Sequence, residues 1–267
     1  MRYPLIKTLL HKIILILLFI IILIISSITN INASTKFLPS ISTTLDEDRE
    51  TDDIDSPKLV NSSKTRYVYL TFDDGPDPKI TPKILDTLKS ENVKATFFVI
   101  GKNVDYYKKT FKRIVSDGHT IGLHSYTHNL SEVYKSDDAF INEMKKSDKL
   151  IKSITGKTTS ILRFPGGTFK RMTPSLLNKL HLNNYKIYDW HSSVDDGMYP
   201  KTSPDKLVKN ALSYGTKGRD IIILLHSRPN NKTTAEALPK LIKHYKSQGY
   251  SFKTLSSNTP EYYFYCK

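Results

Sequence analysis

Hydrophobic and polar residues follow one another along this chain in short blocks that predict alternating strands and helices. Two of the blocks, Ala95–Ile100 and Ile221–Leu225, are almost continuously apolar, as expected for strands that are buried on both faces. The predicted strands cover residues 66–72, 94–100, 119–123, 160–164, 185–190, 220–225 and 251–254, and the predicted helices cover residues 80–91, 103–116, 136–154, 173–181, 204–214 and 232–248. Strands separated by helices in this way indicate a parallel α/β fold, either a barrel or an open doubly wound sheet.

The first 33 residues differ from the rest of the chain and predict an export signal. Basic residues precede the unbroken apolar run Ile13–Ile25, and polar residues follow it up to Ala33, which is the order of a cleavable signal peptide. A membrane anchor is the alternative, but an anchor needs roughly 17 to 25 apolar residues and therefore has to include Ser26–Ile28. Either interpretation places the bulk of the chain outside the cytoplasmic membrane, secreted or anchored at a bacterial cell surface.

The composition of the remaining chain separates a linker from a folded domain. Residues 34–64 are rich in Ser, Thr, Asp and Asn and predict a flexible linker, so the folded domain is predicted to span residues 65–267. The apolar content of 39% is enough for a sizeable core. Cys266 is the only cysteine, which rules out an internal disulfide and a cysteine metal site and suits a bacterial surface.

Charge is distributed unevenly along the chain. Residues 46–55 carry seven acids, whereas residues 56–267 hold 35 Lys and Arg against 19 Asp and Glu, a net charge of +16. A basic domain attracts polyanions such as wall polymers, anionic lipid or nucleic acid. Export argues against nucleic acid and makes a wall polymer the expected partner, and lysines scattered over a solvated surface are the alternative explanation.

Two adjacent aspartates form the first candidate site. In the segment TFDDGP, Asp73 and Asp74 follow an apolar strand directly and precede a Gly-Pro turn, so both carboxylates are predicted to emerge at the end of the strand. Like charges this close are costly to hold together without a cation or a shared proton. The pair therefore predicts either a metal site or an acid/base pair.

The segment HSYTH supplies candidate metal ligands. His124 and His128 are four residues apart, a spacing that we expect to place both imidazoles on one face of a helical turn, where they can hold one ion together. On its own this spacing is weak evidence. Together with an aspartate from another strand end it is stronger, because two histidines and one carboxylate leave coordination positions open for water and substrate.

Further segments place polar groups after other predicted strands. In RFPGG, Arg163 can orient a carboxylate and the N–H groups of Gly166–Gly167 can donate to an oxyanion, although an ordinary Pro-Gly turn explains the same residues. Asp195–Asp196 and His226 follow two more strands. Because active sites of parallel α/β folds lie at the carboxyl ends of the strands, we expect these residues to share one site.

The ordered motifs resemble those of the polysaccharide deacetylases of carbohydrate esterase family four. The resemblance runs from about residue 66 to residue 255 and rests on TFDDGP (71–76), HSYTH (124–128), RFPGG (163–167), the segment 190–196 and LLHS (224–227). It implies a distorted (β/α) barrel of about seven parallel strands with a groove across its top. It also implies a divalent metal, commonly zinc, and the removal of acetyl groups from N-acetylglucosamine polymers.

The resemblance implies a role for each motif residue. Asp74, His124 and His128 would bind the metal, and Asp73 would be the general base. The remaining roles would be the general acid (His226), the partner of that acid (Asp196), the brace of the base (Arg163), the oxyanion donor (the N–H of Gly166), and the acetyl pocket and sugar face (Leu224 and Trp190).

Three positions depart from or complicate the family pattern. Gly197 stands where many members have a tryptophan after the aspartate of the fourth motif, and Gly166 stands where an aromatic residue is frequent. The backbone N–H of Gly166 can still donate, but one wall of the pocket is expected to be more open. The choice between Asp195 and Asp196 as the partner of His226 depends on an alignment without gaps from Trp190.

We therefore expect an extracytoplasmic, metal-dependent N-deacetylase that acts as a monomer on the N-acetylglucosamine of cell-wall peptidoglycan. Export, a linker and a basic domain suit a polyanionic wall substrate. Chitin oligomers and acetylated xylan are alternative substrates, because no motif distinguishes the polymers. A wall-binding module without catalysis is the alternative from another functional class, although base, ligands and acid are all present.

Overall fold

The computed structural model describes residues 65–214 and 219–264. The predicted signal or anchor (1–33) and the predicted linker (34–64) lie outside these residues, as does Cys266. None of the helices in the two described ranges is both long enough and apolar enough to cross a membrane.

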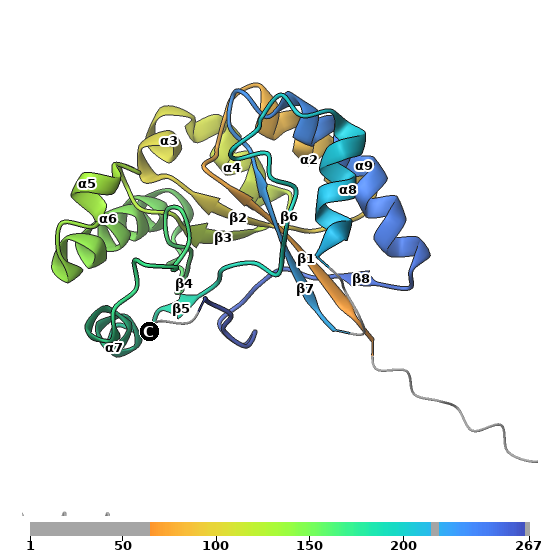
Figure 1. The fold of residues 1–267 in the computed structure, drawn as a ribbon. Coiled ribbons are helices and arrows are strands. Elements are labelled where there is room, and N and C mark those ends of the chain that lie inside the picture. The colour runs from red at the N-terminus through yellow and green to blue at the C-terminus, as the bar shows by residue number, and fades with distance from the viewer. Residues whose placement is uncertain (1–64, 215–218, 265–267) are drawn as a thin grey trace, which may run out of the picture. The chain divides into compact units, whose positions relative to one another are not determined.

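Eight parallel strands form one curled sheet (Figure 1). Their order in space is β5, β4, β3, β2, β1, β7, β6, and β8 pairs with the first residues of β1. The strands are β1 (Tyr67–Asp73), β2 (Thr96–Val99), β3 (Thr120–Leu123), β4 (Ile161–Leu162), β5 (Lys186–Ile187), β6 (Ser192–Ser193), β7 (Ile221–His226) and β8 (Ser251–Phe252). The sheet curls into part of a barrel, which confirms the predicted distorted (β/α) barrel over the open doubly wound alternative.

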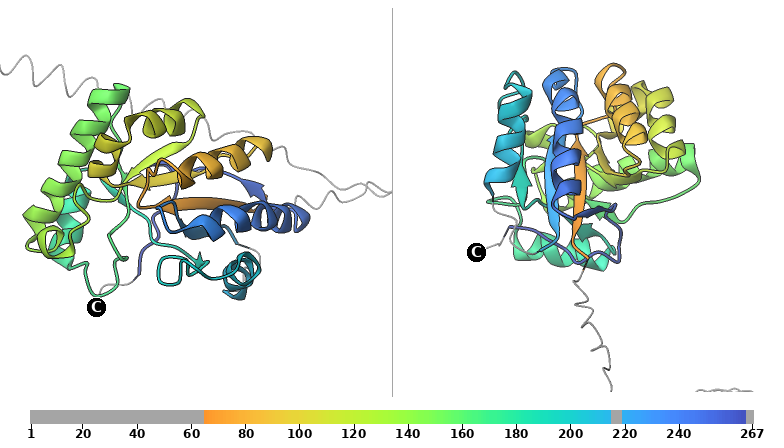
Figure 2. Two further views of the ribbon diagram at one scale, coloured as in Figure 1. Left: turned by 90° about the horizontal axis from the view of Figure 1, so that it is seen from above. Right: turned by 90° about the vertical axis from the view of Figure 1, so that its right-hand side faces the viewer.

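The helices form a layer along one face of this sheet. They contact one another in the order α7, α6, α4, α2, α9, α8, and Figure 2 shows α8, α9 and α2 side by side. The helices are α2 (Ile80–Ser90), α3 (Gly101–Tyr106), α4 (Lys108–Ser116), α5 (Leu130–Val133), α6 (Asp137–Thr155), α7 (Pro174–Leu182), α8 (Pro204–Ser213) and α9 (Lys232–Ser247). Their order follows the order of the strands that they connect, as right-handed crossovers require.

Strand β1 shows why the apolar runs are continuous. Successive side chains of a strand point to opposite faces, and Val68, Leu70 and Phe72 belong to the core beneath the helices. Tyr69 points to the other face, where it packs in a smaller cluster that includes Phe98. Both faces of the strand are therefore buried, and the polar Thr71 on the Tyr69 face is accommodated because its hydroxyl donates to the Ile223 carbonyl at 2.6 Å and accepts from Arg163 at 2.8 Å.

The long helices begin and end at residues whose chemistry explains the boundary. The hydroxyl of Ser136 accepts a hydrogen bond from the Ala139 N–H at the start of α6, and Gly156, with φ of 74°, ends that helix in the left-handed conformation. Thr173 caps α7 in the same way, and Pro174 is its first residue. Caps of this kind fix where the connecting loops leave the helices.

Three local features differ from the sequence prediction. The helix expected over 103–116 is two helices, because Tyr107 adopts φ of −117° and ψ of 46° between α3 and α4. The short helix α5 and the two-residue strand β6 were not predicted. Strand β6 consists of two serines and carries no apolar signal, and its place is set by pairing with Ile223 and Leu224 of β7.

Candidate metal centre and active site

The predicted site residues converge at the carboxyl ends of the strands. A cavity of about 480 Å³ opens there. Its lining includes Asp73, Asp74, His124, His128, Gly166, Trp190, Leu224 and His226. The other two predicted residues, Arg163 and Asp196, are completely buried behind this lining and contact Asp73 and His226 respectively. All ten predicted side chains and backbone positions therefore belong to one place in the fold.

Asp74 and the two histidines form a cluster that lacks a hydrogen-bond partner at its centre. The Oδ1 atom of Asp74 lies 3.4 Å from His124 Nε2 and 3.3 Å from His128 Nε2. The three ligand atoms all lie within 4.8 Å of one another. Asp74 Oδ1 is buried and forms no hydrogen bond, which is costly for a carboxylate oxygen.

The tautomer of His124 explains why a cation fits between these groups. Its Nδ1 lies 2.9 Å from the carbonyl oxygen of Arg163, and because a carbonyl can only accept, Nδ1 carries the hydrogen. In the neutral ring Nε2 then directs a lone pair toward the unpaired oxygen of Asp74. Two electron-rich atoms facing each other at this distance are stabilised by a cation between them, so the three residues fit a divalent metal.

Electrostatics supports the same interpretation. Burial raises the pKa of Asp74, but the neighbouring imidazoles of His124, His226 and His128 hold it well below its usual range. Burial and the charge of His124 lower the pKa of His128. Burial also opposes the protonation of His124, yet the charges of Asp73 and Asp74 raise its pKa, and a bound divalent cation would take the place of that proton.

The two histidines do not lie on a helical turn, which corrects the sequence prediction. Residues 124–129 form an irregular loop in which Ser125 and His128 adopt φ of 64° and 56°, and α5 begins only at Leu130. The Glu143 carboxylate on α6 holds this loop, because its Oε2 accepts from the N–H groups of residues 126 and 127 at 3.1 and 2.7 Å. The loop brings the centroids of the two imidazole rings to 5.1 Å from each other. The two histidines therefore meet because of the loop conformation and not because they are one helical turn apart.

Asp73 is held from one side by Arg163. The guanidinium donates from Nη1 to Asp73 Oδ1 at 2.8 Å, and its other nitrogens donate to the carbonyl oxygens of Tyr188 and Asp189 at 2.7 and 2.9 Å. The group also lies 4.3 Å from the centre of the Phe98 ring. The other oxygen of Asp73, Oδ2, is not bound by Arg163 and lies 3.7 Å from His124 Nε2. It is therefore the oxygen that faces the candidate metal ligands.

Asp196, rather than Asp195, is the partner of His226. Asp196 Oδ1 lies 2.8 Å from His226 Nδ1, and its Oδ2 accepts from the His226 N–H at 2.9 Å and from the Thr234 hydroxyl at 2.6 Å. Burial lowers the pKa of His226, but the hydrogen bond and charge of Asp196, with the charges of Asp73 and Asp74, raise it above its ordinary value. Because Nδ1 faces Asp196, Nε2 is the nitrogen left for chemistry in the cavity.

The remaining wall is built from RFPGG and the segment that includes Trp190. Gly166 has φ of 76°, and the Arg171 guanidinium donates to its carbonyl oxygen at 2.9 Å. A Cβ at Gly167 would lie 2.9 Å from the Trp190 ring, so this glycine lets the indole approach. Leu224 is almost buried, with 7% of its surface exposed.

Residues 262–264 complete this wall by contacting Asp189 and Trp190. Asp189 donates its N–H to the Tyr262 carbonyl at 2.6 Å, and the Phe264 N–H donates to Asp189 Oδ2 at 2.9 Å. The Phe264 ring meets Trp190 edge to face, with centroids 5.1 Å apart. No sequence pattern predicted the contact between Phe264 and Trp190.

Arg228 is a further residue of the cavity that sequence reasoning missed. Its Nη1 lies 3.5 Å from Asp74 Oδ2, Nη2 donates to the Gly197 carbonyl, and Nε donates to Asn231 Oδ1 at 3.1 Å. Asn231 is completely buried and donates to the carbonyl oxygen of Asp196 at 3.1 Å. The only sequence signal was the place of Arg228 two residues beyond His226.

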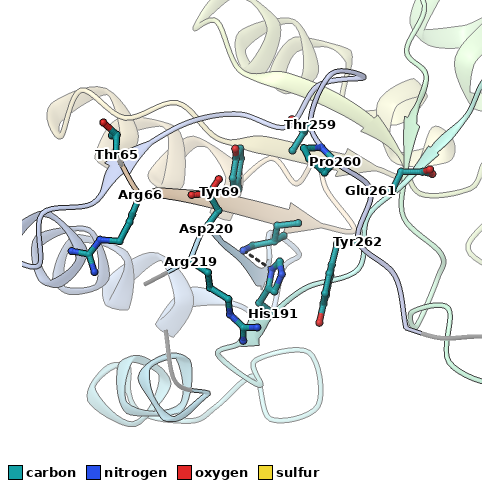
Figure 3. A pocket seen from close by; sticks show the side chains of 11 residues that line it. Thr65, Arg66, Tyr69, His191, Arg219, Asp220, Thr259, Pro260, Glu261 and Tyr262 are labelled. Carbon is teal, nitrogen blue, oxygen red and sulfur yellow. Dashed lines mark hydrogen bonds between the residues drawn. The ribbon is translucent and has the colours of Figure 1, made fainter. Parts of the chain in front are cut away.

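A second cavity, of about 450 Å³, lies at the amino ends of β1 and β7 and contains none of the predicted site residues. Figure 3 shows His191 and Tyr262 on one side of it and Tyr69 and Asp220 on the other. The His191 ring stacks on Tyr262 with centroids 3.7 Å apart, and its Nδ1 accepts from the Ile222 N–H at 3.1 Å. Burial and the charge of Arg219 lower the pKa of His191 to about 4.

Comparison with known proteins finds relatives in sequence and in structure. Residues 61–185 match the family described as Polysaccharide deacetylase. The chain is 36% identical over 202 residues to a peptidoglycan-N-acetylglucosamine deacetylase of Bacillus cereus, a match that covers 74% of this chain and 72% of that protein.

Two solved structures share the fold. A polysaccharide deacetylase from Bacillus cereus superimposes with a TM-score of 0.67 at 36% identity, covering 73% of this chain and 94% of that one. A CE4 esterase from Streptococcus mutans gives a TM-score of 0.68 at 29% identity, covering 73% of this chain and 87% of that one.

Proposed function

The chain belongs to the polysaccharide deacetylase family, and from this premise we propose that it is a metal-dependent hydrolase that removes N-acetyl groups from the N-acetylglucosamine of cell-wall peptidoglycan. The name of its Bacillus cereus relative supports this substrate. The observation that carries the proposal is the unpaired Asp74 Oδ1 between two imidazoles, in the same cavity as Asp73 and His226. That combination supplies a metal position, a base and an acid within one small space.

Asp74, His124 and His128 would hold the ion, which we propose to be zinc. One carboxylate oxygen and two imidazole nitrogens are ligands of catalytic zinc sites, which keep a further position open. When bound, the ion polarises the acetamide carbonyl and lowers the pKa of the attacking water. The hydrogen bond from His124 to the Arg163 carbonyl keeps the imidazole in the tautomer that such binding needs.

Asp73 would accept the proton of the attacking water. Arg163 occupies Oδ1, so Oδ2 on the side of the metal cluster is the oxygen available for the proton. The water oxygen bonds to the acetyl carbon as its proton passes to Asp73. His226 then donates the proton on Nε2 to the amine nitrogen as the C–N bond breaks, and acetate and the free sugar amine leave. The Asp196 carboxylate keeps His226 protonated until that step.

The backbone and apolar wall would position the acetyl group. The N–H of Gly166 would donate to the oxyanion that forms on the carbonyl oxygen, and Leu224 and Trp190 would surround the methyl group and one face of the sugar. Gly166 lines the cavity without a side chain of its own. We propose a polymer as the substrate because the Bacillus cereus relative is named for the N-acetylglucosamine of peptidoglycan.

The location follows from the same proposal. A peptidoglycan substrate requires the domain to act outside the cytoplasmic membrane, and residues 1–33 would export it as a cleaved signal or hold it as an anchor. The basic charge of residues 56–267 would favour the polyanionic wall. We propose that the protein acts there as a monomer with the wall glycan as its partner.

Acetate release from purified peptidoglycan tests the proposal. The expected result is release by the wild-type protein loaded with zinc, and loss of release after chelation with recovery when zinc is returned. Release that is undiminished in the metal-free protein would contradict the mechanism. Glycan binding by a zinc-loaded protein that releases no acetate would instead identify a binding module.

The polymer is tested by rates measured side by side on peptidoglycan, chitin oligomers and acetylated xylan at equal concentrations of acetyl groups. We expect the highest kcat/KM on peptidoglycan. A higher value on either of the other polymers would retain the deacetylase and replace the substrate. The three substrates use the same residues for chemistry, so Asp73→Asn serves as the inactive control for each.

A further inference from the structure

Arg228 lies between the two histidine–aspartate clusters of the cavity. On one side its Nη1 faces the Asp74 oxygen that does not face the histidines, at 3.5 Å. On the other side Nη2 donates to the carbonyl oxygen of Gly197, the residue that follows Asp196. One third of the Arg228 side chain, 34%, is exposed, so it belongs to the wall of the cavity rather than to the core.

Gly197 packs directly on the imidazole of His226. A Cβ built at Gly197 would lie 2.5 Å from His226 Cε1 and 2.9 Å from Nε2, distances that side-chain carbons do not reach. The backbone at Gly197 therefore occupies the space beside the ring edge that carries Nε2. Because Arg228 holds the carbonyl of this residue, it fixes the surface on which the ring rests.

The guanidinium is itself fixed by a buried residue. Asn231 accepts from Arg228 Nε at 3.1 Å, and the amide of the same residue donates to the Asp196 carbonyl at 3.1 Å and to Asp196 Oδ2 at 3.2 Å. One asparagine thus sets the positions of Arg228 and of the partner of His226. A planar group with several fixed donors can serve three acceptors at once, which a lysine ammonium on a flexible stem does poorly.

The contact with Asp74 gives the same group a second effect. The positive charge beside Oδ2 favours the orientation in which Asp74 turns Oδ1 alone toward His124 and His128. A ligand held through one oxygen leaves more of the coordination sphere for water and substrate. The charge also offsets part of the repulsion between the adjacent carboxylates Asp73 and Asp74.

Resting on the proposed deacetylase function, we propose that Arg228 is a positioning residue. It holds the Gly197 backbone against His226 and orients Asp74, and it thereby links the metal-binding residues to the acid. Arg228 contacts neither the acetyl carbon nor the leaving nitrogen in this role. Its removal is expected to slow the chemical step with little effect on substrate binding, because the acid and the metal ligand lose their orientation together.

The first experiment compares Arg228→Gln and Arg228→Lys with the matched control Arg113→Gln in the full chain. Arg113 pairs with Asp86 and Asp117 on the surface, and its replacement is expected to leave activity unchanged. On a water-soluble N-acetylglucosamine oligomer, Arg228→Gln should lower kcat by about 10- to 100-fold with KM within about 3-fold. Arg228→Lys should recover only a small part of the lost kcat, because lysine restores the positive charge but not the planar set of hydrogen-bond donors.

The second experiment uses Gly197→Ala and the double variant. Gly197→Ala should lower kcat by a similar factor while zinc still binds one to one, as measured by calorimetry. Arg228→Gln frees the Gly197 backbone from its position beside His226, and Gly197→Ala adds a methyl group that pushes against the same ring. Since both substitutions disturb the same contact, kcat of the double variant should fall no more than about 3-fold below that of the slower single variant.

Three results would overturn the inference. A rise in KM with unchanged kcat for Arg228→Gln would make Arg228 a substrate contact. Losses that multiply in the double variant would show that Arg228 and Gly197 act independently. Wild-type activity of the Arg228→Gln variant would show that Arg228 has no positioning role in the reaction. Failure of the zinc-loaded wild-type protein on every acetylated glycan would overturn the proposed function instead, so the two failures are distinguishable.

Discussion

Two cavities of similar volume lie at opposite ends of β1 and β7, about 480 Å³ at the carboxyl ends and about 450 Å³ at the amino ends. In the first, a buried carboxylate oxygen of Asp74 has no hydrogen-bond partner. In the second, the acidic and imidazole acceptors hold strand N–H groups: Asp220 accepts from Tyr67 at 2.9 Å and His191 from Ile222 at 3.1 Å. Volume therefore does not distinguish these two cavities, whereas the unpaired oxygen of Asp74 does.

The difference follows from the geometry of parallel strands. At the amino ends the first N–H groups of the strands need acceptors, and side chains such as Asp220, His191 and Glu261 supply them. At the carboxyl ends the loops leave the sheet and bring side chains of separate strands together. The polar groups of one cavity complete the fold, and those of the other remain available for a ligand.

Metal removal should give the largest difference between the two ends. Chelation is expected to reduce acetate release to background, because the Asp74, His124 and His128 cluster would lose the ion that activates water and carbonyl. Equilibrium dialysis followed by metal analysis should find one zinc in the wild type and none in a variant carrying His124→Ala and His128→Ala. Zinc bound with equal affinity by that variant would move the metal site elsewhere.

Asp73→Asn should give the next largest effect. The amide cannot accept the proton of water, so kcat should fall by about 10²- to 10⁴-fold while zinc binding stays near that of the wild type. The matched control is Asp220→Asn at the amino end, whose amide oxygen can still accept from the Tyr67 N–H. A comparable loss in that control would show that the two cavities are not functionally distinct.

Asp196→Asn tests the acid and its pH dependence. Asp196 raises the pKa of His226 above its ordinary value, so the acid stays protonated to higher pH than a free imidazole. Without that negative charge the pKa falls, and the alkaline limb of the kcat profile should move to lower pH. A reduction of kcat of about 10-fold or more should accompany it. An alkaline limb that does not move would assign the acid to another group.

His191→Gln should give the smallest effect, on stability alone. The folded pKa of His191 is about 4, below its ordinary value of 6.5, so the unfolded chain binds the proton more readily. Its contribution is therefore complete above pH 6.5 and is lost as pH falls toward 4. Urea unfolding at pH 7.5 and pH 4.5 should show that the wild type loses on the order of 1 to 2 kcal/mol more than the variant, after allowance for solvent screening.

Activity of His191→Gln at pH 7 should match the wild type within about 2-fold, since surface or structural changes remote from a site act mainly on stability. A large loss of kcat in this variant would mean that the amino-end cavity takes part in the reaction.

The sequence predicted the site better than it predicted the backbone that forms it. Asp73, Asp74 and His226 were placed correctly because strand ends can be located from apolar runs, and the parallel topology brings those ends together. The geometry of His124 and His128 was wrong, because the loop conformation depends on Glu143, a contact across 15 or more residues that no local pattern contains.

The features that were missed have the same physical origin. Arg228 and Asn231 acquire their roles only through contacts with Gly197 and Asp196 in a different loop. Strand β6 has two serines and is formed by its neighbour β7 rather than by its own propensity. Local pattern predicts which residues lie at strand ends, and tertiary contacts decide how those residues are oriented.

The docking of residues 262–264 beside Trp190 has a consequence for biosynthesis and for protein engineering. These residues are translated after all of the motifs that line the cavity, so the aromatic support of the Trp190 wall is absent from every nascent chain that ends before them. Phe264→Ala should make a folded protein in which the Trp190 ring is less firmly held. Affinity tags and fluorescent fusions are accordingly better attached on the amino-terminal side of the domain, which leaves this support undisturbed.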